Sequence, residues 1–153
     1  MKLTSAGAAR TVTGSCHHFE VGSLSALVDC GLFQGGADLD ALNHRPFPFE
    51  PAALDIVLVT HGHLDHVGRL PLLVKGGYGG SLLATQATIE VAGIILRDSA
   101  KLQEEDYKRE LRKARRAGRE SELQGPLYTA ADVEETLKRF RPVELEVKVP
   151  LDG

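Results

Sequence analysis

The chain has few cysteines, no long apolar run and little net charge, and each of these absences narrows its class. Cys16 and Cys30 belong to no CxxC pair and to no secreted cysteine framework, so we expect two buried free thiols. No stretch approaches the roughly 18 apolar residues of a membrane span, and the N-terminus lacks the pattern of a signal peptide. We therefore expect no membrane partner and a cytoplasmic location.

The charge balance excludes a general attraction of the chain to polyanions. A net charge of −3 gives it no overall tendency to gather on nucleic acid or on an anionic membrane, so any such attraction must be local. The stretch 108–119 is a local candidate for such an attraction, because it contains seven Lys and Arg residues and one Glu, a net charge of +6. RNA phosphates could dock there, but cations are equally favoured at the C-terminal end of a helix.

Length and patterning predict one α/β domain. The 153 residues, 42% of them hydrophobic, are enough to build a core. The run 55–60 lacks polar alternation, which predicts a central strand covered on both faces. Strands alternate with helices along the chain, as in an α/β layered fold. Strands are expected over 2–5, 16–21, 24–30, 55–60, 81–84 and 143–151, and helices near Leu39 and over 67–75, 86–117 and 130–140.

The last residues carry a hairpin signal. Asp152-Gly153 is the strongest two-residue pattern for a tight β-hairpin, in which a returning strand follows at once. No such strand follows in this sequence. We therefore expect residues 1–153 to be the N-terminal piece of a longer protein.

The most informative stretch is a run of four metal-coordinating side chains directly after the predicted central strand. It reads His61-Gly62-His63-Leu64-Asp65-His66. Side chains two apart in an extended segment share a face, so His61 and His63 are predicted to bind one metal, with Gly62 allowing a tight turn. Asp65 and His66, inside the next helix, are predicted to point away toward a second metal. Imidazole and carboxylate ligands favour zinc over iron or manganese.

The ligand count and the alternative role of these residues also follow from the sequence. A catalytic zinc has three protein ligands and one open position, whereas this chain offers two ligands to each metal. We therefore expect the 153 residues alone to bind metal weakly. In the alternative, the histidines are hydrogen-bonded beside a helix start and Asp65 is its cap. His17, His18 and His44 are predicted to be structural or solvated.

The motif matches the HxHxDH signature of the metallo-β-lactamase superfamily, which the chain resembles. Three further segments are similar to the β-CASP ribonucleases, relatives of the nuclease subunit of the cleavage and polyadenylation specificity factor: Gly-Ser-Cys-His at 14–17, Leu-Val-Asp-Cys-Gly-Leu-Phe-Gln-Gly at 27–35 and Pro-Leu-Tyr-Thr at 126–129. The resemblance implies the first half of an αββα layered sandwich, a mixed sheet flanked by helices. The remaining half and the β-CASP domain would lie outside this chain.

The resemblance also implies an activity. It is that of a zinc-dependent ribonuclease with two zinc ions, which hydrolyses phosphodiester bonds of single-stranded RNA. His61, His63, Asp65 and His66 would be the metal ligands, and Asp65 would also act as the catalytic acid or base. Asp29 corresponds to an acid that orients the metal-binding loop; its alternative is a turn-forming Asp before Gly31.

Other functions remain as alternatives. The same metal centre could hydrolyse a small thioester, lactone or β-lactam, although the resemblance over residues 14–35 disfavours this. A non-catalytic scaffold subunit of an RNA-processing complex is disfavoured by the complete ligand set. An exposed half-core could also drive association into a homo-oligomer.

Overall fold

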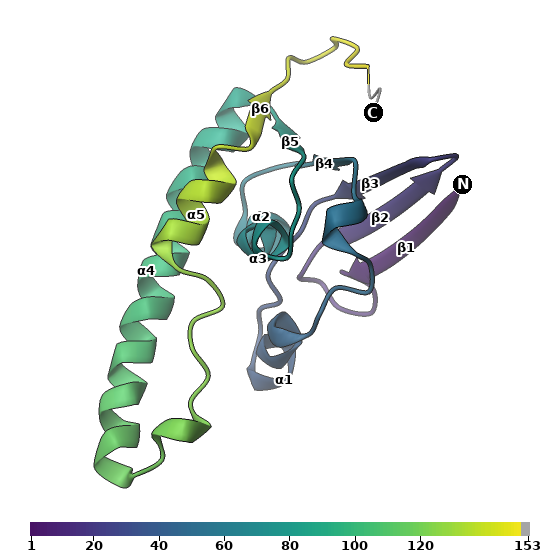
Figure 1. Ribbon diagram of the computed structural model, residues 1–153. Coiled ribbons are helices and arrows are strands. Elements are labelled where there is room, and N and C mark those ends of the chain that lie inside the picture. Colours follow the sequence, from purple (N-terminus) through teal and green to yellow (C-terminus); the bar gives the residue numbers. More distant parts are fainter. Residues whose placement is uncertain (151–153) are drawn as a thin grey trace.

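The computed structural model describes residues 1–150, which form one six-stranded mixed sheet flanked by helices (Figure 1). The strands lie side by side in chain order: β1 (Lys2–Gly7), β2 (Cys16–Val21), β3 (Leu24–Val28), β4 (Ile56–Leu58), β5 (Ser81–Ala84) and β6 (Phe140–Pro142). β1, β2 and β3 pair antiparallel as a meander, and β3 to β6 pair parallel. This confirms the predicted α/β class with a mixed sheet.

Along the chain, the helices form the connections between the parallel strands. They are α1 (Ala37–Asp40), the 3-10 turns η1 (Ala41–His44) and η2 (Pro51–Ala53), α2 (Leu64–Val67), α3 (Leu70–Lys75), α4 (Gln86–Ala117), η3 (Glu120–Glu122) and α5 (Ala130–Leu137). α4 begins where the Thr85 side chain accepts the Thr88 amide and ends at Gly118 in the left-handed conformation, φ 65°. Thr129 and Asp132 form a capping box at the start of α5. Within residues 1–150 no helix has the length and hydropathy of a bilayer span.

The core lies on the helix-covered face of the sheet. Leu27, Val57 and Leu82 occupy one register row and are fully buried, in one cluster with side chains of α3, α4 and α5. The neighbouring row on the other face holds Leu58 and Leu83, which are only half-buried. β4 is therefore central, as predicted, but one of its faces is covered completely and the other only in part.

Several expected element boundaries were wrong; the strand predicted over 24–30, for example, ends at Val28. The predicted helix over 67–75 is two short helices, because the chain breaks at Gly68 and Arg69. The predicted strand 55–60 contributes only Ile56–Leu58, and the helix over 130–140 ends at Leu137.

The predicted strand 143–151 is also wrong over its described part. The ladder between β5 and β6 ends at the pair Ala84 and Pro142; the Val143 amide still donates to the Ala84 carbonyl at 2.9 Å, but no strand pairs with the described residues after it. Glu146 at φ 63° interrupts the extended backbone, and Leu145 remains 82% exposed. The alternating pattern of this stretch suits a strand, but a strand forms only where a partner ladder exists. Leu151 and the hairpin signal at 152–153 lie outside the described residues.

Candidate metal centre

The motif begins in the connection between β4 and α2 and continues into α2. Residues 59–63 follow the strand without regular secondary structure, and His63, the residue before α2, is extended with φ −69° and ψ 149°. The His63 carbonyl accepts the amides of His66 and Val67, which closes the first turn. Asp65 lies in this first turn but caps nothing, because α2 has no side-chain cap. The predicted strand-to-helix placement of the motif is confirmed.

All four predicted ligands lie in one cluster. The His61 ring centroid is 3.8 Å from that of His66 and 4.8 Å from that of His63. His66 Nε2 lies 3.6 Å from Asp65 Oδ2. His63 is exposed and the other three are half-buried, so the cluster is open to solvent. The prediction that His66 points away from His61 was wrong, because the short α2 turns its ring back against the His61 ring.

Asp29 is the buried centre of hydrogen bonds behind this cluster. Its side chain is 3% exposed, and its backbone adopts φ 60°, a left-handed conformation that Asp and Asn tolerate better than most residues. Its carboxylate accepts the Thr60 amide at 2.9 Å and the Thr60 hydroxyl at 2.8 Å. The Ser15 hydroxyl donates to it at 3.3 Å. His66 Nδ1 lies 2.7 Å from Asp29 Oδ2. A buried carboxylate is costly unless its oxygens are satisfied in this way.

The Asp29 contact fixes how His66 presents its ring. An ionised carboxylate only accepts hydrogen bonds, so Nδ1 of His66 carries the proton and donates. In the neutral imidazole this leaves the lone pair on Nε2, on the side of Asp65. Metal-binding histidines characteristically have this arrangement, with the other ring nitrogen bonded to a carboxylate.

Thr60 is a site residue that sequence reasoning missed. Its hydroxyl contacts Asp29 and also lies 3.1 Å from His61 Nδ1. It therefore links the buried acid to a second histidine of the cluster. The available signal was a hydroxyl residue at the strand end, directly before the first histidine of the motif.

The backbone of the meander holds α2 in place. The amides of Ser15, Cys30 and Leu32 donate to the carbonyls of Asp65, His66 and Leu64 at 2.8, 2.8 and 3.0 Å. A β-carbon on Gly31 would lie 1.6 Å from the Asp65 carbonyl oxygen, so only glycine permits this approach. Besides the side chains of Ser15 and Asp29, the segments 14–17 and 27–35 therefore support the motif through main-chain contacts, which the sequence did not reveal.

Gly62 has a different role from the one predicted. It is buried, and a β-carbon there would lie 2.7 Å from Val91 Cγ1 and 3.0 Å from the Ala92 amide nitrogen. Its φ is not positive, so no turn demands glycine at this position. Glycine is needed because the motif packs directly against α4.

The surroundings favour the neutral forms of two groups, the His61 imidazole and the nearby Cys30 thiol. Burial lowers the pKa of His61, and the charges of His66 and His63 lower it further, against the opposing effect of Asp29 and Asp65. Cys16 and Cys30 are buried and unpaired, as predicted. Burial raises the pKa of Cys30 well above its usual range, which keeps the thiol protonated and disfavours it as a metal ligand.

Sequence comparison decides the family. Residues 12–78, which contain the Asp29 loop and the whole motif, match the pattern of the Metallo-beta-lactamase superfamily. The chain belongs to the metallo-β-lactamase superfamily. This confirms the resemblance inferred from the HxHxDH residues.

Three relatives of this metallo-β-lactamase chain are named as a ribonuclease, a transcription termination factor and a cleavage and polyadenylation factor. It is 42% identical over 144 residues to Ribonuclease TTHA0252 of Thermus thermophilus, covering 94% of this chain and 28% of that protein. It is 32% identical over 148 residues to the Transcription termination factor FttA of Methanocaldococcus jannaschii, covering 96% and 21%. It is 26% identical over 144 residues to Cleavage and polyadenylation specificity factor 73 of Drosophila melanogaster, covering 94% and 19%.

The chain thus spans between 19% and 28% of the length of these relatives. A solved metallo-beta-lactamase fold protein, YhfI from Bacillus subtilis, aligns with 57% of this chain and 39% of that chain, at 26% identity and a TM-score of 0.40. Because this superposition is partial, the family assignment rests on the sequence matches.

The donors of the cluster fit a transition metal in kind. Three imidazoles and one carboxylate are the nitrogen and oxygen ligands that zinc, iron and manganese take in proteins. The hydrogen bond between Asp29 and His66 also matches the support that metal ligands receive. Among the residues that the structure describes, however, no three such side chains stand at the spacing of a preformed metal site. The side chains of His61 and His66, whose rings lie against each other, would have to rotate to converge on an ion.

Proposed function

We propose that this chain carries the metal-binding motif of a zinc-dependent ribonuclease that hydrolyses phosphodiester bonds of single-stranded RNA. The single observation that supports it most is the path from buried Asp29 through His66 to the solvent-open cluster of His61, His63 and Asp65. A catalytic metal site needs ligands that the protein holds in position by hydrogen bonds and that remain accessible to water and substrate. The names of the ribonuclease and cleavage-factor relatives favour RNA as the substrate.

In this proposal each side chain has a defined task. His61, His63, Asp65 and His66 would hold two zinc ions, which supply Lewis acidity and make hydroxide available near neutral pH. Asp29 and Thr60 hold the rings of His66 and His61 in position. Asp65 has one carboxylate oxygen 3.6 Å from His66 Nε2, and it would accept the proton of the attacking water.

The number of donors sets how tightly this chain should bind metal. Four ligands shared between two ions fall short of the three per ion in catalytic zinc sites, so the remaining ligands would come from other residues of the protein. We expect the 153-residue chain to lose zinc on dialysis. Two zinc ions retained per chain would contradict the proposed ligand set.

Activity is tested on the protein expressed from its full reading frame. With zinc present it should cleave end-labelled single-stranded RNA, and Asp65→Ala should reduce kcat by at least about a hundredfold while the thermal midpoint stays unchanged. His44→Ala is the matched control, because His44 is exposed and outside the cluster. Retained turnover in Asp65→Ala would rule out the assigned role. Hydrolysis of a thioester or lactone but not of RNA would replace the proposed substrate.

A further inference from the structure

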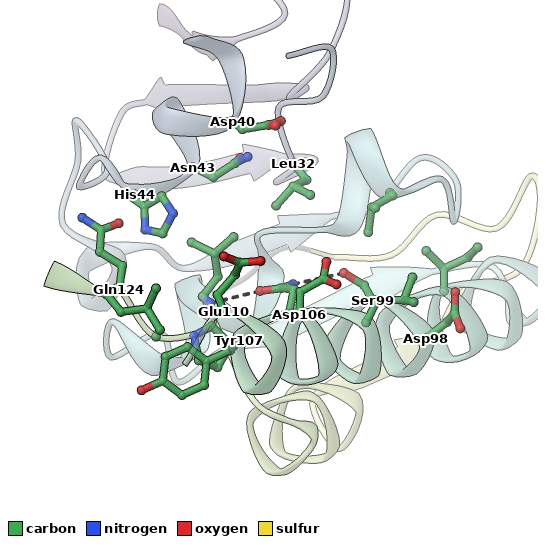
Figure 2. Close-up of a pocket in the computed structure, with 18 residues that line it drawn as sticks. Leu32, Asp40, Asn43, His44, Asp98, Ser99, Asp106, Tyr107, Glu110 and Gln124 are labelled. Atoms are coloured by element: carbon green, nitrogen blue, oxygen red, sulfur yellow. Dashed lines mark hydrogen bonds between the residues drawn. The ribbon is translucent and has the colours of Figure 1, made fainter. Parts of the chain in front are cut away.

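A groove lies along α4, beginning at Leu64 beside the metal motif. It is bounded by α4 on one side, by α1 and η1 on the other, and by the connection 123–127 (Figure 2). Its volume is about 480 Å³. Its floor is apolar and consists of Leu32, Leu64, Ile95, Leu102, Leu123 and Leu127. Leu102 is 52% exposed, a large apolar surface to leave uncovered.

The side chains around this floor are acidic. Asp40, Asp98, Asp106 and Glu110 line the groove, whereas no Lys or Arg does so within the part of the chain that the structure describes. Asp106 and Glu110 pair with Arg109 and Lys113, both at 2.8 Å. Asp40 and Asp98 have no described cation within 4.0 Å. The groove therefore attracts cations and repels the phosphates of RNA.

The complementary charge lies at the far end of the same helix. Figure 1 shows that the C-terminal end of α4 extends past α1 and away from the sheet. Several basic residues there are paired, for example Lys108 with Glu104 at 3.9 Å and Arg115 with Glu120 at 3.7 Å. Arg112 and Arg116 are exposed, and no described carboxylate lies within 4.0 Å of them.

Asp98 cannot meet Arg112 within one molecule. Asp98 and Arg112 are fourteen residues apart on one straight helix, and a rise of 1.5 Å per residue separates them by about 21 Å. Two antiparallel copies of α4 remove this separation. The basic end of each helix then lies beside the acidic groove of the other, and a two-fold axis makes every contact twice.

We propose that two copies of this chain pair through antiparallel α4 helices, with the basic end of each in the acidic groove of the other. Arg112 and Arg116 would place their guanidinium groups against Asp40 and Asp98. Their aliphatic stems would cover the exposed floor at Leu102, as long cationic side chains do on apolar surfaces. Because the contact is isologous, it yields a closed dimer and no filament.

Light scattering after size-exclusion chromatography tests the pairing on the 153-residue chain. The chain should elute at twice its mass at low salt and dissociate as salt is raised. Asp40→Lys with Asp98→Lys should raise the dissociation constant of the dimer about tenfold or more, and so should Arg112→Glu with Arg116→Glu. Glu144→Lys is the control, because this exposed acid follows β6 and lies outside both α4 and the groove. Circular dichroism checks that each variant is folded.

Mixing the two charge-reversed variants gives the sharper result. In a mixed pair both contacts regain opposite charges, so an equimolar mixture should restore the dimer that each variant alone has lost. A monomeric wild-type chain would overturn the proposal, and so would folded variants that stay monomeric when mixed. Dimers that persist in both variants would also overturn it and would place the contact on another surface, such as the half-buried row of Leu58 and Leu83.

Discussion

Replacing Asp29 by asparagine tests whether this buried acid holds the metal-binding residues in place. Asparagine tolerates the left-handed backbone at φ 60° and keeps the shape of the side chain, so the change removes charge and one acceptor oxygen. With the amide oxygen kept on the Thr60 amide, an NH2 group faces His66 Nδ1, which is itself a donor. The charge-assisted bond from Nδ1 is then lost: Nδ1 either has no acceptor or accepts from the NH2 group with the ring proton moved to Nε2, where it blocks metal binding.

The size of the effect follows from the bonds involved. A hydrogen bond to a charged group contributes about 1.5–3 kcal/mol, so losing one should destabilise the chain by about 2 kcal/mol. For a chain of this length that lowers the thermal midpoint by roughly 4–8 °C. Loss of a carboxylate behind a metal-binding histidine typically weakens metal affinity about 10- to 100-fold. We expect both effects in Asp29→Asn.

Thermal unfolding followed by circular dichroism and zinc competition with a chromophoric chelator measure the two effects separately. Asp38→Asn is the matched control, because Asp38 is exposed on α1. A lower midpoint with unchanged zinc affinity would show that Asp29 stabilises the fold without orienting His66. No change in either quantity would refute the hydrogen-bond reasoning altogether.

Two further predictions concern stability. Gly31→Ala would place a methyl group 1.6 Å from the Asp65 carbonyl oxygen, and it should lower the free energy of unfolding by about 3 kcal/mol in a denaturant titration. Gly79→Ala, where a β-carbon meets open space, should cost less than a third of that, and equal losses would contradict the close-contact argument. Burial raises the pKa of Tyr78 from 10.0 to about 12. Because the phenol ionises more readily in the unfolded chain, its contribution to stability is complete below pH 10 and is lost as the pH rises toward 12. Ultraviolet difference absorbance should give a midpoint near 12 for Tyr78, and a midpoint near 10 would contradict the burial effect.

The sequence predicted features that depend on neighbouring residues. The meander, the long helix 86–117 and the capped helix after Thr129 follow local periodicity and capping residues, and the structure confirms them. The grouping of His61, His63, Asp65 and His66 follows from their closeness along the chain.

Features that depend on distant residues did not follow from local patterns, and a role of Asp29 behind the metal-binding loop was implied only by the family resemblance. Asp29 contacts Thr60 and His66 across 31 and 37 residues, and no local pattern encodes those pairings. The main-chain support of α2 by Ser15 and Cys30 leaves no trace in side-chain chemistry. The prediction of a strand over 143–150 was wrong for a related reason: the stretch has the alternation of a strand, but no described strand forms a ladder with it.

The shortness of helix α2 has one further consequence for the local unfolding of the site. With only four residues, Leu64–Val67, it is too short to persist alone, and its carbonyls are bonded to amides of the meander. Any fluctuation that detaches α2 must expose the amides of Ser15, Cys30 and Leu32 to solvent at the same moment. These three amides should give one common opening free energy in hydrogen exchange, because the N-terminal meander and the histidine cluster open as a single cooperative unit.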